Sequence, residues 1–174
     1  MLKKSGLAGE KITLDALHCN EPTLGLIAGA KGKYLVGLKN NQKELLKQVS
    51  RQNEETFILY QSREIEKGHG RIETRHYEIY DILEMEKAER WNDCQIRMAI
   101  KLVREREELK SGKKSVETSY YLSNAVGGYE EIVGAIRRHW QVETNNHIRD
   151  VSLKEDQMRS KKRISSEQWQ KLGH

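Results

Sequence analysis

The feature that most constrains the fold is a strand, a helix and a second strand within fewer than thirty residues near the N-terminus. Residues 11–17 (KITLDAL) alternate apolar and polar side chains, as a half-buried strand does. Asn20 and Pro22 then supply an N-cap and a first-turn proline for a short helix that Gly32 closes. Residues 34–39 (YLVGLK) are an apolar run of strand length. This order predicts two parallel strands joined by a right-handed crossover.

The sequence changes character after a second predicted helix, residues 42–50, for which Asn41 is the expected N-cap. Residues 57–83 read as a hairpin around the turn KGHG. Residues 95–107 read as a third long strand, although their charged end is also compatible with a helix. The turn SGKK leads into a fourth strand, VETSYYLSN. The chain is therefore predicted to be an α/β piece followed by an antiparallel, β-rich stretch.

A helix is expected from Tyr129 to about Val151, and it carries an acid on its apolar side. At 100° per residue, one arc of this helix collects Ile132, Ile136, His139, Trp140 and Glu143. Desolvating a carboxylate is costly unless a cation, a metal ion or hydrogen bonds compensate its charge. Glu143 is therefore either a structural acid paired with a neighbouring arginine or histidine, or a metal ligand.

A second acid, Asp15, lies near the C-terminal end of the first predicted strand. In open α/β sheets, ligands gather at that edge, although Asp15 taken alone fits slightly better as a cap of the turn before His18 and Asn20. If Asp15 and Glu143 share a site, two hard oxygen ligands would come from a strand end and from a helix packed on the sheet. Such ligands suit Mg²⁺, and two ions about 4 Å apart suit phosphodiester chemistry.

Composition narrows the class of protein without fixing it. The 174 residues suit one domain, or one domain with an insertion, and Lys+Arg 31 against Asp+Glu 26 gives a net charge of +5. This excess is compatible with nucleic acid as a partner but does not prove it. Two cysteines fit reduced thiols better than a disulfide framework. No apolar run has the length of a membrane span or a signal peptide, so we expect an intracellular protein without a membrane anchor.

Three segments resemble, in family order, the bacterial DDE transposases of the group that includes the H-repeat-associated proteins. They are ITLDALHCN, then KGHGRIETR, then RRHWQVETNNHIRDVSLKED followed by RSKK, and the resemblance runs from Lys11 to about Arg163. It implies an α/β fold: a partial ribonuclease-H-like core, made of the parallel βαβ unit and the catalytic helix, with an inserted antiparallel β-rich region at about residues 54–125. The implied catalytic domain covers residues 1–163, and residues 164–174 form a weakly patterned tail.

The resemblance also assigns the acids. It implies that Asp15 is the family's second catalytic aspartate and Glu143 its catalytic glutamate, both as ligands of Mg²⁺ (or Mn²⁺). The family's first aspartate comes from an earlier strand. The segment before Asp15, MLKKSGLAGEKITL, contains one carboxylate, Glu10, which is too close to Asp15 to replace that first aspartate. We therefore expect a fragment that does not catalyse transposition alone, with an unprotected edge and an uncovered apolar face on its first two strands. His147 and Asp150 accompany Glu143 without an assigned role.

The segment KGHGRIETR raises a separate expectation. On a strand, Arg71, Glu73 and Arg75 share one face, with His69 at the turn. Two guanidiniums on one face suit phosphate oxygens, whereas the alternative is a cross-strand ladder of salt bridges. The resemblance favours contact with the DNA backbone through six residues: His69, Arg71, Arg75, Lys161, Lys162 and Arg163.

The function implied by the resemblance is DNA transposition. A member of the family cleaves and joins strands of double-stranded DNA at the ends of an insertion sequence, in the bacterial cytoplasm and on the nucleoid. Three other functions stay open: a DNA-binding module without chemistry, a nuclease of the same fold, and a remnant without activity. The sequence leaves the DNA sequence recognised and the oligomeric state, including a homodimer, undetermined.

Overall fold

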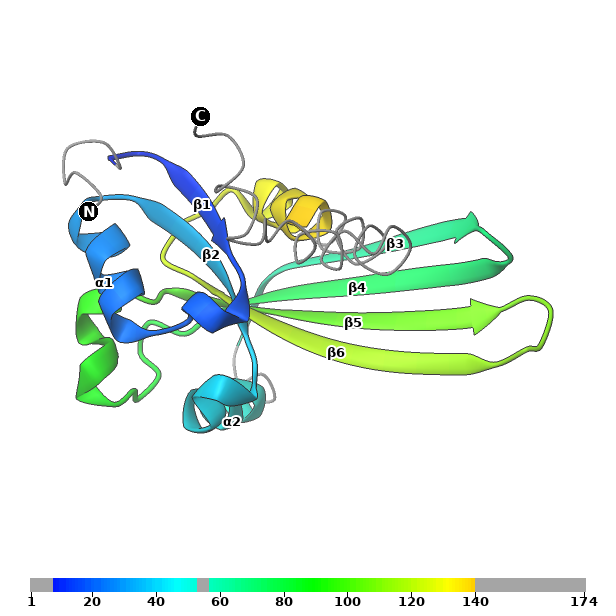
Figure 1. Cartoon of the computed structure of the whole chain (residues 1–174), viewed down its shortest axis with the longest axis horizontal. Coiled ribbons are helices and arrows are strands. Elements are labelled where there is room, and N and C mark those ends of the chain that lie inside the picture. Colours follow the sequence, from blue (N-terminus) through cyan, green and yellow to red (C-terminus); the bar gives the residue numbers. More distant parts are fainter. Residues whose placement is uncertain (1–7, 53–56, 140–174) are drawn as a thin grey trace, which may run out of the picture. The chain divides into compact units, whose positions relative to one another are not determined.

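The computed structural model describes residues 8–52 and 57–139 of the chain, which divides into two compact units, Met1–Ile136 and Arg137–His174. The first unit is built on one six-stranded sheet with the strand order β1-β2-β6-β5-β4-β3 (Figure 1). The pair β1–β2 is parallel, and every other neighbouring pair is antiparallel. The unit is therefore a mixed α/β structure with a mostly antiparallel sheet.

The predicted strand–helix–strand unit is present as β1 (Lys11–Leu14), α1 (Glu21–Gly29) and β2 (Lys33–Leu38). Asn20 is the N-cap of α1, because its Oδ1 accepts a hydrogen bond from the Thr23 amide at 3.0 Å. The first strand ends at Leu14 and does not reach residue 17 as expected. It ends there because Asp15 turns the chain into a short 3₁₀ helix, η1 (Ala16–His18).

The predicted β-rich stretch forms two long hairpins. They are β3 (Ile58–Gly68) with β4 (Arg71–Asp81), and β5 (Met98–Glu108) with β6 (Lys114–Ser123). The charged end of β5 is a strand and not a helix, since it stays paired with β4 as far as Glu108. From Ile100 to Arg104 of β5, every second residue is buried, in agreement with the period-two pattern that predicted this strand.

The hairpins and the parallel pair form one sheet because β6 pairs with β2, from Leu35 opposite Ser123 to Leu38 opposite Tyr120. The prediction that residues 34–39 have an uncovered apolar face is therefore wrong. The strand β2 has a neighbouring strand on each side and is buried from Tyr34 to Leu38. The expected open edge applies to β1, which is the outermost strand on that side of the sheet.

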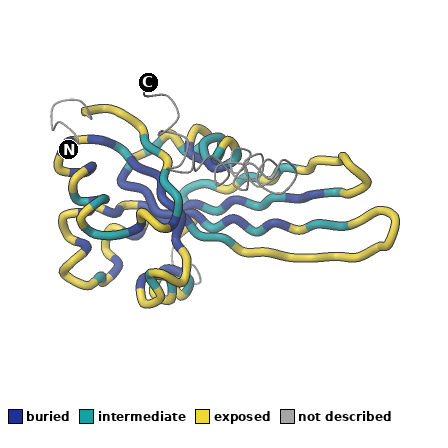
Figure 2. Tube along the Cα trace, viewed as in Figure 1, coloured by how far each residue is buried: buried dark blue, intermediate teal, exposed yellow. Residues whose placement is uncertain are grey.

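Each face of the sheet has its own core. One face packs against α1, α2 (Lys43–Gln52) and the 3₁₀ helix η3 (Glu89–Cys94), with Tyr34, Val36 and Leu38 of β2 at its centre. The opposite face packs against the helical residues 129–136, of which Ile132, Val133 and Ile136 are buried. Figure 2 shows that burial concentrates where these elements cover the sheet, while the far ends of the hairpins are exposed. Within the described residues, no helix has the length and apolar character needed to cross a membrane.

Candidate functional site

Asp15 stands directly at the C-terminal end of β1, as predicted. Its backbone is extended, with φ −68° and ψ 158°, and its Oδ1 accepts a hydrogen bond from the Ala16 amide at 2.5 Å. Ala16 is buried against β2, where an added Cβ at Gly37 would lie 3.3 Å from the Ala16 nitrogen. Because β1 and β2 are parallel, their C-terminal ends meet at one edge of the sheet. The turn that carries Asp15 therefore lies at that edge.

The carboxylate of Asp15 is half-buried and keeps one oxygen without a partner among the described side chains and amides. A carboxylate oxygen of this kind suits a hard divalent cation, so Asp15 fits the role of one metal ligand. Nowhere in residues 8–52 and 57–139 do three or more His, Cys, Asp or Glu side chains gather into a metal site. The capping interpretation also holds, since Oδ1 already serves the 3₁₀ turn.

The helix expected to carry the second acid begins at residue 129, directly after Gly127 and Gly128, which have φ angles of 71° and 67°. Its first turn is fixed to β1, because Glu131 accepts hydrogen bonds from Lys11 Nζ at 2.6 Å. Glu143 and its neighbours His147 and Asp150 lie outside the described residues. The pairing of Asp15 with Glu143 therefore stays a prediction.

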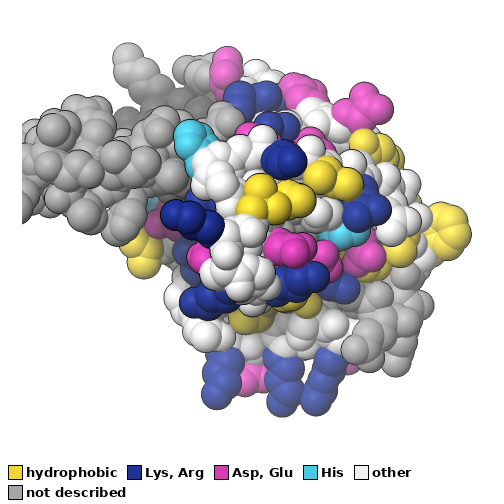
Figure 3. Space-filling model, turned by 90° about the vertical axis from the view of Figure 1, so that its right-hand side faces the viewer, with side chains coloured by type: hydrophobic (Ala, Val, Ile, Leu, Met, Phe, Trp, Pro, Cys, Tyr) yellow, Lys and Arg dark blue, Asp and Glu magenta, His cyan; other side chains and the backbone are white. Residues whose placement is uncertain are grey.

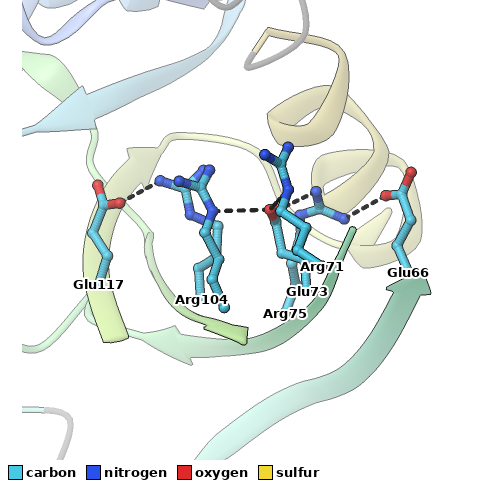
Figure 4. Close-up of polar contacts among 7 residues, drawn as sticks. Glu66, Arg71, Glu73, Arg75, Arg104 and Glu117 are labelled. Carbon is cyan, nitrogen blue, oxygen red and sulfur yellow. Dashed lines mark hydrogen bonds and ion pairs between the residues drawn. The ribbon is translucent and has the colours of Figure 1, made fainter. Parts of the chain in front are cut away.

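A charged cluster occupies the outer part of the sheet face that, further in, packs against the helical residues 129–136 (Figure 4). Its centre is Glu73 on β4, whose side chain is only 6% exposed. Glu73 accepts hydrogen bonds from Arg75 and from Arg106 Nε, the latter at 2.9 Å, and Arg71 Nε lies 3.9 Å from its Oε2. Three guanidiniums thus converge on one buried carboxylate.

The cluster continues across the neighbouring strands. Arg75 also donates to Glu66 on β3 at 3.0 Å, and the buried Arg104 on β5 donates to Glu117 on β6. Burial alone would lower the pKa of Arg75, but its hydrogen bond to Glu66 and the charge of Glu73 outweigh this effect and raise the pKa. The geometry is that of the cross-strand ladder, the alternative considered from the sequence for Arg71 and Arg75.

The turn between β3 and β4 presents the other predicted DNA-contacting residues of the hairpin. His69 and Arg71 are exposed there, and the amide of Leu109 donates to the Gly70 carbonyl at 2.9 Å, which joins this turn to the one between β5 and β6. We call residues 67–71 and 108–114 together the hairpin tips. Figure 3 views the molecule from the side of the tips, where basic and acidic side chains are interspersed.

The hairpin tips carry more basic residues than the sequence interpretation assigned. Residues 67–71 and 108–114 contain five exposed basic side chains and one acid, Glu108, while Glu107 next to them pairs with Lys114 at 3.5 Å. The five are Lys67, Arg71, Lys110, Lys113 and Lys114. The turn SGKK was the available signal for the last two, but only the contact between the two turns brings them beside His69 and Arg71. The predicted contacts Lys161, Lys162 and Arg163 lie outside the described residues.

Asn41 has a different role from the N-cap expected of it. It lies within a 3₁₀ turn, η2 (Asn40–Gln42), and its Nδ2 donates to the carbonyl of Ala16, in the turn that carries Asp15. Sequence patterns gave no signal for this contact, because a side chain that binds a distant backbone carbonyl follows no periodicity.

Comparison with known proteins gives two matches. The family described as "Transposase DDE domain" matches residues 1–170. A protein of Escherichia coli O157:H7 named "Putative transposase YncI" is 28% identical over 173 residues, an alignment that covers 90% of this chain and 42% of that protein. The chain thus spans less than half the length of this relative. No solved structure matches the chain.

Proposed function

Because the chain belongs to the transposase DDE domain family, we propose that it takes part in DNA transposition, by metal-dependent cleavage and joining of DNA strands at the ends of an insertion sequence. The observation that carries this proposal is the family match over nearly the whole chain, together with an acid at the C-terminal end of β1. The proposed core is ribonuclease-H-like, with β1, α1, β2 and the helix from residue 129 as its parts and residues 54–125 as its insertion.

In this proposal Asp15 and Glu143 hold Mg²⁺ or Mn²⁺. Bound divalent ions would activate the attacking oxygen and stabilise the leaving oxygen of the phosphodiester. Asp15 contributes the carboxylate oxygen that the Ala16 amide does not use, and the capping bond to that amide orients the group. Capping and ligation are therefore compatible roles for the two oxygens of one side chain.

The metal site is tested by replacing Mg²⁺ with Fe²⁺ in the presence of hydrogen peroxide and ascorbate. The iron reduces the peroxide to hydroxyl radicals that cut the backbone beside the bound ion, and ascorbate restores Fe²⁺. We expect cuts close to Asp15 and Glu143, with loss of the cuts at both places in Asp15→Asn and in Glu143→Gln. Asp81→Asn is the matched control, because Asp81 ends β4, where its Oδ1 accepts a hydrogen bond from the Leu83 amide. Cuts that persist in Asp15→Asn would overturn the assignment of the site.

The proposed partner is double-stranded DNA, held through its phosphates. The exposed basic residues of the hairpin tips support this, since lysines and arginines at exposed loop ends are suited to phosphate contacts. Arg75 is less accessible, with 19% of its side chain exposed and both its acidic neighbours engaged. We therefore propose that His69, Arg71 and the lysines of the tips contact the backbone, and that Arg75 acts mainly in the ladder.

DNA binding measured across a salt series tests this division. Arg71→Ala should weaken binding to all sequences alike and reduce the slope of log affinity against log salt by about one unit. Arg75→Ala should leave the slope nearly unchanged, and Lys47→Ala on α2 is the control for a basic residue remote from the tips. A sequence-selective loss would point instead to base recognition, and unchanged binding in Arg71→Ala would remove the tips from the interface.

A DNA-binding module without chemistry is the second candidate function. It is favoured by the combination of exposed basic tips with an acid that already serves as a cap. The Fe²⁺ cuts separate the two candidates, since DNA binding without cuts near Asp15 and Glu143 would favour the module. A cleavage and strand-transfer assay on cognate DNA ends with Mg²⁺ or Mn²⁺ tests the separate expectation that this chain alone does not catalyse transposition.

A further inference from the structure

The turn that carries Asp15 is held in place by the turn that follows the neighbouring strand. Asn41 Nδ2 donates to the Ala16 carbonyl at 2.6 Å, and Gln42 Nε2 donates to the Cys19 carbonyl at 2.8 Å. The two accepting carbonyls belong to the first residue of the 3₁₀ turn η1, Ala16, and to the residue that follows it, Cys19. Two consecutive amide side chains therefore bracket the turn that begins at Asp15.

Gln42 is itself fixed by a second layer of contacts. Its Oε1 accepts a hydrogen bond from Arg90 at 3.2 Å, and Arg90 also donates to Glu21 in the first turn of α1 at 2.6 Å. The Arg90 guanidinium also lies over the ring of its neighbour Trp91, 4.9 Å from the ring centre, which restricts the side chain of Arg90. The amide of Gln42 thus has little freedom to leave the Cys19 carbonyl.

Close packing leaves the turn no alternative position towards β2. An added Cβ at Gly37 would lie 3.3 Å from the Ala16 nitrogen and 3.4 Å from the Ala16 Cβ. Ala16 therefore rests directly on the β2 backbone, while the amides of Asn41 and Gln42 hold the carbonyls of Ala16 and Cys19. These contacts fix the backbone of the turn that follows Asp15, and the hydrogen bond from the Ala16 amide to Oδ1 orients the Asp15 carboxylate.

We propose that Asn41 and Gln42 are positioning residues for Asp15, which hold its carboxylate where a divalent ion is bound. This inference rests on the proposed function, because it assumes that Asp15 is a metal ligand. Metal ligands act only when held within about 0.5 Å of their productive geometry, and that task falls to neighbouring hydrogen bonds. Asn41 is exposed and Gln42 is half-buried, so their bonds contribute modestly to folding and mainly to the local geometry of the turn.

The experiment is a nuclear magnetic resonance titration of the full chain with Mn²⁺, which broadens the amide signals of residues close to the bound ion. In the unsubstituted chain we expect the signals of Ala16 to His18 to broaden, and the broadening to disappear in Asp15→Asn. The variant with both Asn41→Ala and Gln42→Ala should need about three- to tenfold more Mn²⁺ for the same broadening, as expected for the loss of one or two modest hydrogen bonds.

Asn124→Ala is the matched control. The Asn124 amide also binds two backbone groups of the β2 region, the Gly32 carbonyl at 3.0 Å and the Tyr34 amide at 2.9 Å, but at the opposite end of the strand. It is buried, so its loss should cost more stability than the loss of Asn41. Unchanged Mn²⁺ broadening in Asn124→Ala then separates positioning from a general loss of stability.

Hydrogen exchange in the same samples distinguishes failure of this inference from failure of the proposed function. The amides of His18 and Cys19 donate to the carbonyls of Asp15 and Ala16, and we expect them to exchange about three- to tenfold faster in the double variant. An absence of Asp15-dependent broadening would overturn the metal role of Asp15, and with it the proposed function. Asp15-dependent broadening that the double variant leaves unchanged would overturn positioning alone, as would unchanged exchange.

Discussion

The buried carboxylate of Glu73 is the residue on which the charged cluster depends. It lies between the guanidiniums of Arg75 and Arg106 with only 6% of its side chain exposed. Glu73→Gln keeps the shape but leaves the arginines without their shared counter-charge. We expect a loss of about 2–3 kcal/mol in the free energy of unfolding, below the value for fully buried pairs because these arginines keep contact with water.

Urea unfolding measures this loss, and Glu107→Gln is its matched control. Glu107 pairs with Lys114 at 3.5 Å, but the two side chains are 44% and 72% exposed, so the control should lose between about 0 and 1 kcal/mol. Equal effects of the two substitutions would contradict the central role of Glu73 in the cluster.

Among the elements, the β3–β4 hairpin contains a turn that was predicted from the sequence but whose first residue, His69, is not the best suited to its backbone conformation. Its two turn residues, His69 and Gly70, have φ angles of 50° and 73°, as a two-residue turn of type I′ requires. Asparagine adopts positive φ more readily than histidine does. His69→Asn should therefore raise the free energy of unfolding by about 0.5–1 kcal/mol.

Thermal or urea unfolding of His69→Asn and His69→Ala gives the comparison. Alanine removes the imidazole without relieving the backbone, so only asparagine should stabilise the chain. A gain with both substitutions would mean that the imidazole, rather than the backbone angle, is unfavourable. If His69→Asn stabilises the hairpin while DNA binding falls, the loss of affinity belongs to the imidazole and not to a distorted turn.

The hairpins were predictable because period-two alternation and the glycine turns KGHG and SGKK are local signals. The end of β1 was predicted too late, since Ala16 continues the alternation of Ile12 and Leu14 while Asp15 caps a turn. The bracing amides could not be predicted, because Asn41 and Gln42 bind carbonyls that lie more than twenty residues earlier in the chain. Local patterns identified the position of the candidate acid but not the contacts that fix it.

At the scale of the whole described unit, the pairing of β6 with β2 determines the architecture. It converts a βαβ unit and two hairpins into one sheet with a core on each face. No local sequence pattern predicts this pairing. It follows from the burial of β2 on both faces and from Asn124, whose amide continues the hydrogen bonding at the end of β6. The sequence predicted an inserted antiparallel region at about residues 54–125, but it gave no signal that β6 of this region would pair with β2.

Two thiols in one of these cores make the folded unit less stable at alkaline pH. Cys19 and Cys94 are both fully buried, and burial raises the pKa of Cys19 to about 12 and that of Cys94 to about 11. In an unfolded chain a thiol ionises near about pH 8.5. Between these pH values the folded state retains protons that the unfolded state releases. The contribution of the neutral thiols to the free energy of unfolding is therefore fully present below about pH 8.5, and it is lost as the pH rises towards the pKa values of the folded state.

We therefore expect the free energy of unfolding to fall above about pH 9, by up to about 1.4 kcal/mol per pH unit for each thiol. Urea unfolding under reducing conditions at about pH 7.5, 9 and 10 measures the slope. The variant with Cys19→Ala and Cys94→Ala should be less stable at about pH 7.5, because it leaves cavities, but should lose less stability as pH rises. Part of the slope should remain near pH 10, since burial also raises the pKa of Tyr34 and Tyr80. Equal slopes in both proteins, or native thiols that react with a disulfide reagent as fast as unfolded ones, would contradict the burial of these groups.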